Sequence, residues 1–170
     1  PSRGIRLRQG GSQGRAGFGT INNVIFKGYG ADSTIAVHIA ADAGNFAINN
    51  VSAKDCLQAV LQSAGAVGGI ITGVTGSGIY GDGMSIGGND LIINGYSAKN
   101  TTGSDRLCDV ESTAVNFNLC NFFTDETTAS SQGIRVNSGA ASTSFANGSM
   151  RGGAIDDSGT GTVQTNVRAI

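Results

Sequence analysis

The heptapeptides INNVIFK (residues 21–27), INNVSAK (48–54) and INGYSAK (93–99) are near copies of one another. Four further segments, beginning at Ile71, Leu119, Phe145 and Gln164, share the pattern less closely. In this alignment the third position is always Asn or Gly: Asn23, Asn50, Gly73, Gly95, Asn121, Asn147 and Asn166. Asn and Gly enter left-handed backbone geometry at the lowest cost. The column therefore predicts a ladder of bends, one for each repeat.

The positions after each bend predict a short strand with one buried face. Strand side chains alternate between two faces, so the fourth and sixth positions of a repeat point the same way. These positions are mainly apolar, as Val24 and Phe26 are in the first copy. The copies begin 19 to 27 residues apart, close to the repeat lengths of solenoids. We therefore expect about seven stacked coils, each adding a strand to a common sheet.

The composition favours a single all-β domain. The 170 residues include 28 Gly and one Pro, at position 1. Pro cannot donate a backbone hydrogen bond, so its scarcity suits a sheet whose strands are paired on both sides. Gly and β-branched residues leave residues 53–64 as the one stretch compatible with a helix. No run of apolar residues is long enough to span a bilayer.

Further strands are expected between the repeats, so that each coil closes. The candidates are residues 34–39, 57–61, 78–80, 106–111, 133–136 and 153–155. The stretches that link them are rich in Ser, Thr, Gly and Asp, as exposed turns are. Stacking of the coils then supplies the hydrophobic core that one coil alone lacks.

Short Gly-Ile strands followed by turns and by apolar-x-Asn-x-Val segments resemble the right-handed parallel β-helix proteins of the pectate-lyase and bacteriophage tailspike type. The resemblance covers about residues 18–170 and implies that fold. The phage members are the more similar, because the chain lacks Trp and its coils are rich in Ser, Thr and Gly. In the phage members the resemblance implies assembly as homotrimers. The fold alone does not give the function.

An acidic pair is the strongest candidate for catalysis. Asp109 and Glu111 are two residues apart on an expected strand, so they share a face about 6.5 Å apart, within the range for paired glycosidase carboxylates. The alternative is a solvated outer face or a contact with a partner subunit. A chain without Trp is also poorly equipped to line a polysaccharide groove. We therefore expect a non-enzymatic protein, with a polysaccharide lyase or glycosidase as the alternative.

No metal or cofactor site is expected. His38 is the single histidine, and by alternation it lies opposite Val37 and Ile39, on the outer face. One His cannot build a multi-histidine zinc site, and the cysteines lack the spacing for thiolate ligation. Cys56, Cys108 and Cys120 are instead expected to be reduced thiols packed inside the coils. Reduced thiols fit folding in the reducing cytoplasm of a host cell.

The N-terminal segment, residues 1–17, predicts a basic arm that precedes the β-helix domain of residues 18–170. It contains Arg3, Arg6, Arg8 and Arg15 and no acid, whereas the rest of the chain holds 7 Lys and Arg against 12 Asp and Glu. No aromatic residues accompany the arginines, so a protein target is favoured over nucleic acid. Ile5 and Leu7 alternate with Arg6 and Arg8 as they would in an added strand. A tail without function is the alternative.

Together these features suggest a bacteriophage virion protein, a trimeric capsid decoration (cement) protein located on the virion surface and anchored by its arm. Ile25 and Phe123 are candidate residues of the trimer seam, since each lies between inward positions. A tailspike or tail-fibre segment that binds a host-surface glycan is the first alternative. No contact with a membrane is expected. Ice binding would require a regular Thr-x-Thr ladder, which the sequence lacks.

Overall fold

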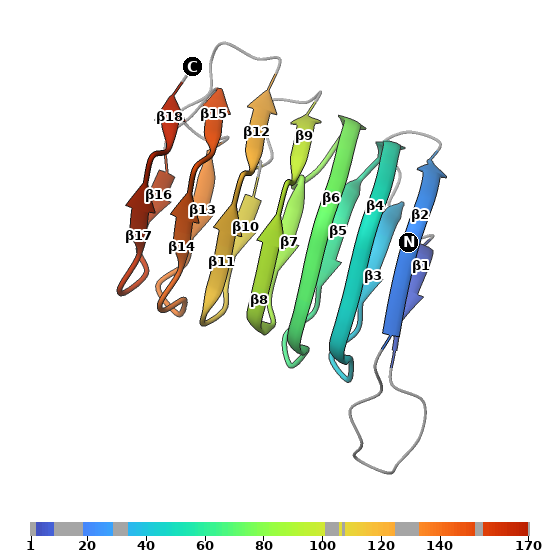
Figure 1. Ribbon diagram of the computed structural model, residues 1–170, viewed down its shortest axis with the longest axis horizontal. Coiled ribbons are helices and arrows are strands. Elements are labelled where there is room, and N and C mark those ends of the chain that lie inside the picture. The colour runs from blue at the N-terminus through green and yellow to red at the C-terminus, as the bar shows by residue number, and fades with distance from the viewer. Residues whose placement is uncertain are drawn as a thin grey trace.

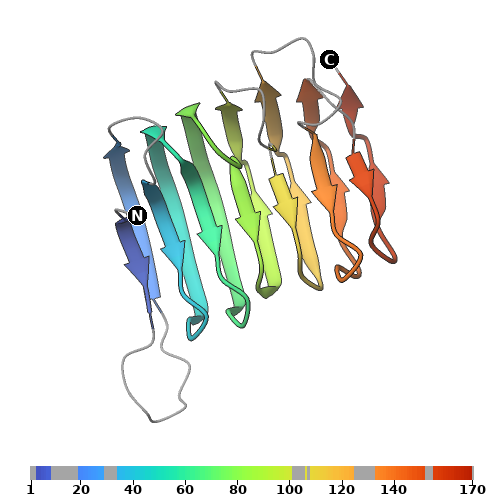
Figure 2. The same ribbon diagram turned by 180° about the vertical axis from the view of Figure 1, so that it is seen from behind.

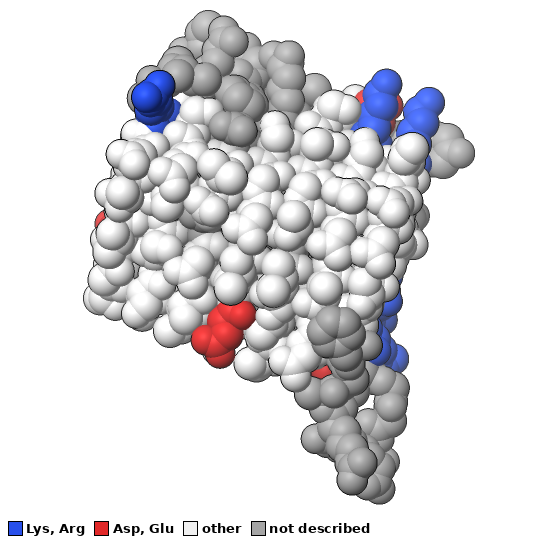
Figure 3. Space-filling model, in the orientation of Figure 1, with Lys and Arg blue, Asp and Glu red and all other residues white. Residues whose placement is uncertain are grey.

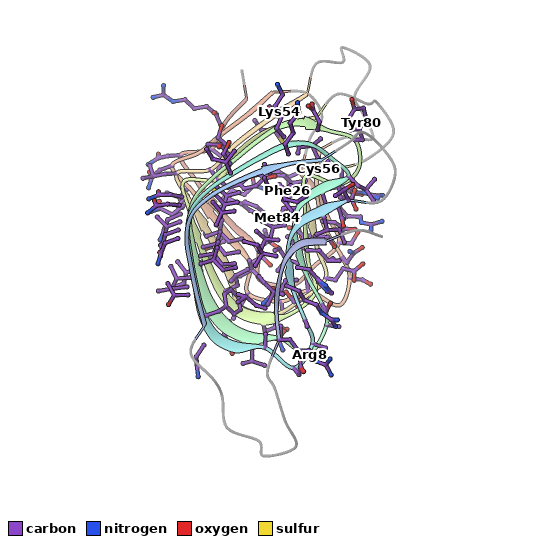
Figure 4. All side chains as sticks on the ribbon, turned by 90° about the vertical axis from the view of Figure 1, so that its right-hand side faces the viewer. Arg8, Phe26, Lys54, Cys56, Tyr80 and Met84 are labelled. Atoms are coloured by element: carbon purple, nitrogen blue, oxygen red, sulfur yellow. The ribbon has the colours of Figure 1, made fainter. Side chains whose placement is uncertain are left out.

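The computed structural model describes residues 3–8, 19–28, 34–100, 106, 108–124, 133–151 and 155–169. These residues form two parallel β-sheets and no helix. Figures 1 and 2 show the longer sheet and the shorter sheet from opposite sides. Figure 4 is a view from the N-terminal end, with the long sheet on the left and the short sheet on the right. The chain runs up the long sheet and down the short sheet as it recedes from the viewer, so its path is clockwise and the solenoid is right-handed (Figures 1 and 4). The predicted right-handed parallel β-helix is therefore confirmed.

Each coil contributes one strand to the short sheet and one or two strands to the long sheet. The short sheet follows the chain in order: β1 (Arg3–Leu7), β3 (Ile35–Ile39), β5 (Gln58–Gln62), β7 (Met84–Ile86), β10 (Cys108–Val110), β13 (Ile134–Val136) and β16 (Ile155–Asp157). The long sheet begins with β2 (Gly19–Lys27), β4 (Gly44–Cys56) and β6 (Val67–Ile79). It continues with the pairs β8 (Asn89–Asn94) and β9 (Ser97–Asn100), β11 (Val115–Asn118) and β12 (Asn121–Thr124), β14 (Ser144–Ala146) and β15 (Ser149–Arg151), and β17 (Val163–Thr165) and β18 (Arg168–Ala169).

A ladder of left-handed residues bends the long sheet, with one residue for each coil. Its members, with φ between 52° and 66°, are Asn23, Asn50, Gly73, Gly95, Leu119, Asn147 and Asn166. The strand registers place them in one column. Gly73 fits this column because a Cβ there would lie 2.9 Å from the Oδ1 atom of Asn50.

The fifth member of this ladder corrects the prediction. Leu119 occupies the left-handed position, whereas the predicted Asn121 lies two residues later in β12, where it pairs with Ser97 and Ser149. The repeat in this coil therefore begins at Phe117. A shift of two residues is hard to detect from sequence, because it leaves the same side chains facing inward.

A second left-handed column, which the sequence did not reveal, begins the long strands. Its members are Asn45, Gly68, Asp90, Ala114, Ser142 and Gly161, with φ between 48° and 70°. Strand pairing and backbone hydrogen bonds between coils place them in register. Their residue types differ too much to form a visible repeat. The long sheet is thus bounded and bent by two such columns.

The core lies between the two sheets and consists of stacked rows of apolar side chains. One row of the long sheet places Ile21, Ile48, Ile71 and Ile93 in register, all of them buried. Figure 4 shows Phe26, Cys56 and Met84 between the sheets and Arg8 and Lys54 outside them. Burying one Ile side chain contributes about 1.5–3 kcal/mol.

One local prediction was wrong. Residues 78–80 were expected to be a strand that closes a coil, but Ile79 ends β6, and β7, the three-residue strand Met84–Ile86, closes that coil instead. The strand expected at residues 57–61 is present as β5, so the stretch of residues 53–64 that was compatible with a helix is not helical.

The predicted boundary after residue 17 also changes. Residues Arg3–Leu7 form β1, which pairs in parallel with β3. Ile5 and Leu7 pack against the core. Residues 9–18 lie outside the described part of the chain. The N-terminal strand therefore belongs to the solenoid itself.

Candidate interaction surface

The central part of the outer side of the long sheet is uncharged. Six successive coils contribute the segments 20–25, 47–52, 70–75, 92–97, 116–121 and 144–149, none of which contains Lys, Arg, Asp, Glu or His. The last coil adds residues 163–168, which end in Arg168. We call the outward side chains of these segments the long-sheet face. Figure 3 shows this face with charged groups only along its margins.

The long-sheet face also carries exposed apolar side chains. Six large hydrophobic residues are exposed among the described residues: Ile25, Val67, Ile70, Ile92, Leu119 and Val163. Five of them lie in the segments of the long-sheet face, and Val67 lies at the start of β6 beside it. Ile70 and Ile92 are register neighbours on adjacent strands and are 46% and 42% exposed. Exposed apolar groups that gather on one face mark interaction surfaces.

Side-chain amides on this face bond to one another along the solenoid axis. The Nδ2 of Asn49 donates to Oδ1 of Asn22 at 2.8 Å, and Nδ2 of Asn50 donates to Oδ1 of Asn23 at 3.2 Å. Towards the C-terminal end, Asn166 donates to Asn147 at 3.2 Å. An amide both donates and accepts, so a column of identical Asn residues can satisfy itself.

The two predicted seam residues lie in different columns of the long sheet. Ile25 lies on the long-sheet face and is 87% exposed. Phe123 lies in β12, in register with Lys99 and Arg151, and its side chain is outside the described part. By this register, Phe123 shares a column with Lys27 and Lys54 rather than with Ile25.

The acidic pair is divided between two environments. Asp109 lies in β10 and is 4% exposed, while Glu111 follows that strand and is exposed. Both oxygens of the Asp109 carboxylate accept hydrogen bonds from the guanidinium of Arg135, in β13. Asn137 donates a further bond of 2.8 Å to Oδ1. This bonding raises the pKa of Arg135, and it engages Asp109 in holding two coils together.

Of the four predicted anchoring arginines, Arg6 and Arg8 have described side chains, and they lie in β1 and directly after it rather than on a free arm. Arg6 is exposed on β1, in register with His38. Nε of Arg8 lies 3.3 Å from Oδ2 of Asp42, an exposed ion pair with a neighbouring coil. The side chain of Arg3 and all of Arg15 lie outside the described residues. Surface ion pairs of this kind contribute little, about 0–1 kcal/mol.

His38 and the thiols take structural positions. His38 lies on the outer side of the short sheet, as predicted from alternation, but it is buried, and Nε2 lies 2.9 Å from Oγ of Ser63. Cys56, Cys108 and Cys120 are free and buried. Desolvation by burial, with a smaller effect of Asp55 on Cys56, raises the pKa of Cys56 to about 11, and burial raises that of Cys120 to about 11 as well. Thiols with raised pKa values are poor nucleophiles at neutral pH.

The described residues hold neither a cluster of metal ligands nor a helix that could span a membrane. No three His, Cys, Asp or Glu side chains within the described ranges gather where they could hold a metal ion. The same part of the chain contains no helix of the length and apolarity that crossing a membrane requires.

Comparison with known proteins gives no relative. No protein-family model, no curated protein and no solved structure matches this chain. The fold and its surface chemistry are therefore the basis for an assignment of function.

Proposed function

We propose that this chain is a non-enzymatic structural protein of a bacteriophage virion, a capsid decoration protein, and that the long-sheet face is buried between the subunits of a homotrimer. The observation that carries the proposal is the chemistry of that face. It lacks charge over six coils and bears five of the six large apolar side chains that are exposed in the described part of the chain. Charged residues are depleted at the centres of protein interfaces, and contiguous apolar groups are favoured there. The virion assignment depends on the resemblance stated above.

The different environments of Asp109 and Glu111 favour a structural role over a depolymerase. A general acid or base must be able to gain and lose a proton near the substrate. Asp109 is buried and accepts three hydrogen bonds from Arg135 and Asn137. Glu111 alone remains exposed, and the two-carboxylate mechanisms of glycosidases need a pair.

The mass in solution tests the proposal. Light scattering coupled to size exclusion should give three times the 17.1 kDa of one chain. The double variant Ile70→Lys, Ile92→Lys places two charges in register at the centre of the face, and at low protein concentration it should give monomers with an unchanged circular dichroism spectrum. Glu111→Lys, an exposed change on the other side of the solenoid, is the matched control and should leave the trimer intact. A monomeric parent protein, or a trimer that survives the double variant, would contradict the trimer.

A polysaccharide assay tests the enzymatic alternative separately. Incubation with capsular polysaccharides should release no reducing ends and no unsaturated sugars. If either were released, and if Asp109→Asn or Glu111→Gln stopped the release, the protein would be a depolymerase.

A receptor-binding segment of a tail structure is the second candidate, and a groove favours it. A depression of about 310 Å3 follows the bend of the long sheet and is lined by Asn23, Ile25, Asn50, Ser52 and Thr75, among others. Amides and hydroxyls beside apolar groups suit an uncharged glycan. Binding to a neutral glycan on an array, weakened by Asn50→Ala and Ser52→Ala, would favour this candidate over the decoration protein.

A further inference from the structure

The two ends of the solenoid present complementary strand edges. Among the described residues, β1 and β2 are paired on one side only, and so are β16, β17 and β18. In a parallel stack, each coil uses one edge to pair with the coil that follows it. The last coil has the same edge, and no described strand of this chain pairs with it. An exposed strand edge is a template for pairing with another chain. A second copy placed on this end would continue both sheets.

The amide ladder has a direction that matches at the two ends. Asn50 donates to Asn23, and Asn166 donates to Asn147, so each amide group points its donor towards the preceding coil. This direction leaves the Nδ2 of Asn23 facing out of the N-terminal end and the Oδ1 of Asn166 facing out of the C-terminal end. Within the described residues, neither atom has another side-chain partner. Joined end to end, the donor of one copy meets the acceptor of the next.

One column of outward residues on the short sheet also has complementary charges at its two ends. This column contains, in order, Arg6, His38, Leu61, Ser85, Asp109, Arg135 and Asp156. Arg135 donates to Asp109 of the preceding coil. Asp156 ends the column and is exposed, and Arg6 begins it and is exposed. A following copy would therefore place its Arg6 beside Asp156 as Arg135 lies beside Asp109.

We propose that molecules of this protein associate head to tail, with β16–β18 of one copy pairing with β1 and β2 of the next. This contact is distinct from the side-by-side contact proposed above, because it pairs the strand edges of the two terminal coils and leaves the outward side chains of the central coils, including Ile70 and Ile92, uncovered. A head-to-tail contact does not close on itself, so it produces open stacks that lengthen with concentration. It also covers Ile25 with the aliphatic stem of Arg168, which lies in the same column.

Two polar residues of the last coil make the contact weak. Gln164 occupies a column that is otherwise apolar, and it would face Ile21 of the next copy. Asp157 occupies a column in which Gln62 is the one other polar residue, and it would face Leu7 of the next copy. Oδ1 of Asp157 is already held by the backbone N–H of Gly159 at 3.0 Å and by the hydroxyl of Thr162 at 2.9 Å. Polar outer layers on terminal coils limit stacking in repeat proteins. The stacks are therefore expected to be reversible and to form at high protein concentration.

Sedimentation velocity over a range of concentrations tests the contact. The Ile70→Lys, Ile92→Lys protein serves as the parent, so that side-by-side association does not interfere. Its average mass should rise with concentration. Arg6→Asp and Asp156→Arg each turn an attraction into a repulsion and should weaken the association constant roughly tenfold. The combined charge swap should restore association, and Gln164→Ile should strengthen it.

The control and the contrary outcomes are distinct from those of the trimer. Asp90→Arg changes an exposed acid outside the column of Arg6 and Asp156 and should leave the association unchanged. If the Ile70→Lys, Ile92→Lys protein stays monomeric at every concentration, the head-to-tail proposal is wrong. So would single charge reversals without effect, or a combined swap that fails to restore association. None of these results would bear on the trimer, which is measured with the unmodified long-sheet face.

Discussion

The outer faces of the two sheets share one architecture but carry opposite chemistry. On the long sheet, the columns of the central part are uncharged, and some repeat one residue type, as the amides of Asn22, Asn49 and Asn94 do. On the short sheet, one column alternates in sign through Asp109, Arg135 and Asp156. In both sheets, neighbouring residues of a column are about 4.8 Å apart.

This difference shows what parallel stacking permits. An amide has a donor and an acceptor, so identical amides satisfy one another at this spacing. A carboxylate only accepts and repels its own kind, so a charged column must alternate. Lys27 and Lys54 are like charges in register, but both are exposed at the margin of the long-sheet face, where water and salt screen them. The long sheet is thus free to present a neutral face, whereas β10 and β13 of the short sheet are joined through charge.

The largest loss of stability is expected at a position of the long sheet where only a glycine fits against a neighbouring side chain. Gly69 has φ 151°, and a Cβ there would lie within 2.3–2.7 Å of three ring atoms of Phe46. Gly69→Ala should therefore lower the free energy of unfolding by about 3 kcal/mol or more, measured by urea denaturation. Gly139→Ala is the matched control, because a Cβ there meets nothing within 4 Å. Its effect should stay within about 0.5 kcal/mol. Equal losses in the two variants would refute this account.

The next largest loss of stability is expected at the ion pair of Asp109 with Arg135 in the short sheet. Asp109→Ala leaves the guanidinium of Arg135 without its bidentate partner and removes an acceptor for Asn137. The expected loss is about 2 kcal/mol, below that for a fully buried pair because the Arg135 side chain is 29% exposed. Glu111→Ala, two residues away and exposed, should change the free energy of unfolding by less than about 0.5 kcal/mol. A loss for Glu111→Ala as large as that for Asp109→Ala would remove the distinction between the two carboxylates.

Much of the fold could be predicted from the sequence, because the first left-handed column repeats Asn and Gly and the inward columns repeat apolar residues. The error at Leu119 arose because left-handed geometry at this position is imposed by the coils on either side rather than by the residue itself. Ala114, in the second column, was missed for the same reason. The three residues of β7 were too few to show a period between glycines.

The candidate surface was only partly predicted. The absence of charge from six aligned segments was visible in the sequence, but its meaning required the register that places them on one face. The ion pair of Asp109 with Arg135 could not be anticipated, because 26 residues separate the partners and the loops that set their register vary in length. Neighbours across coils depend on that register, and the sequence constrains it only where a column repeats.

A gain in stability is expected at the one non-polar residue of the first left-handed column. Leu119 adopts φ 54° and exposes 57% of its surface, so it has the cost of left-handed geometry without the benefit of burial. Leu119→Asn should raise the free energy of unfolding by about 1 kcal/mol. Val163→Asn, equally exposed but in β17 outside both columns, is the control and should give no gain. A gain at both positions would point to a general benefit of polar residues on the long-sheet face.

The smallest effect is expected from the thiols of the core, which both sheets enclose. Burial raises the pKa of Cys56 and of Cys120 to about 11, against an ordinary value of 9.0 in the unfolded chain. Above pH 9 the unfolded state therefore loses these protons first, and stability falls as the pH rises from about 9 towards 11. Between pH 7 and pH 9 the loss should be a few tenths of a kcal/mol for each thiol. Urea denaturation at both pH values should show a smaller decline for Cys56→Ala than for the parent, and an identical decline would mean that Cys56 does not contribute to it.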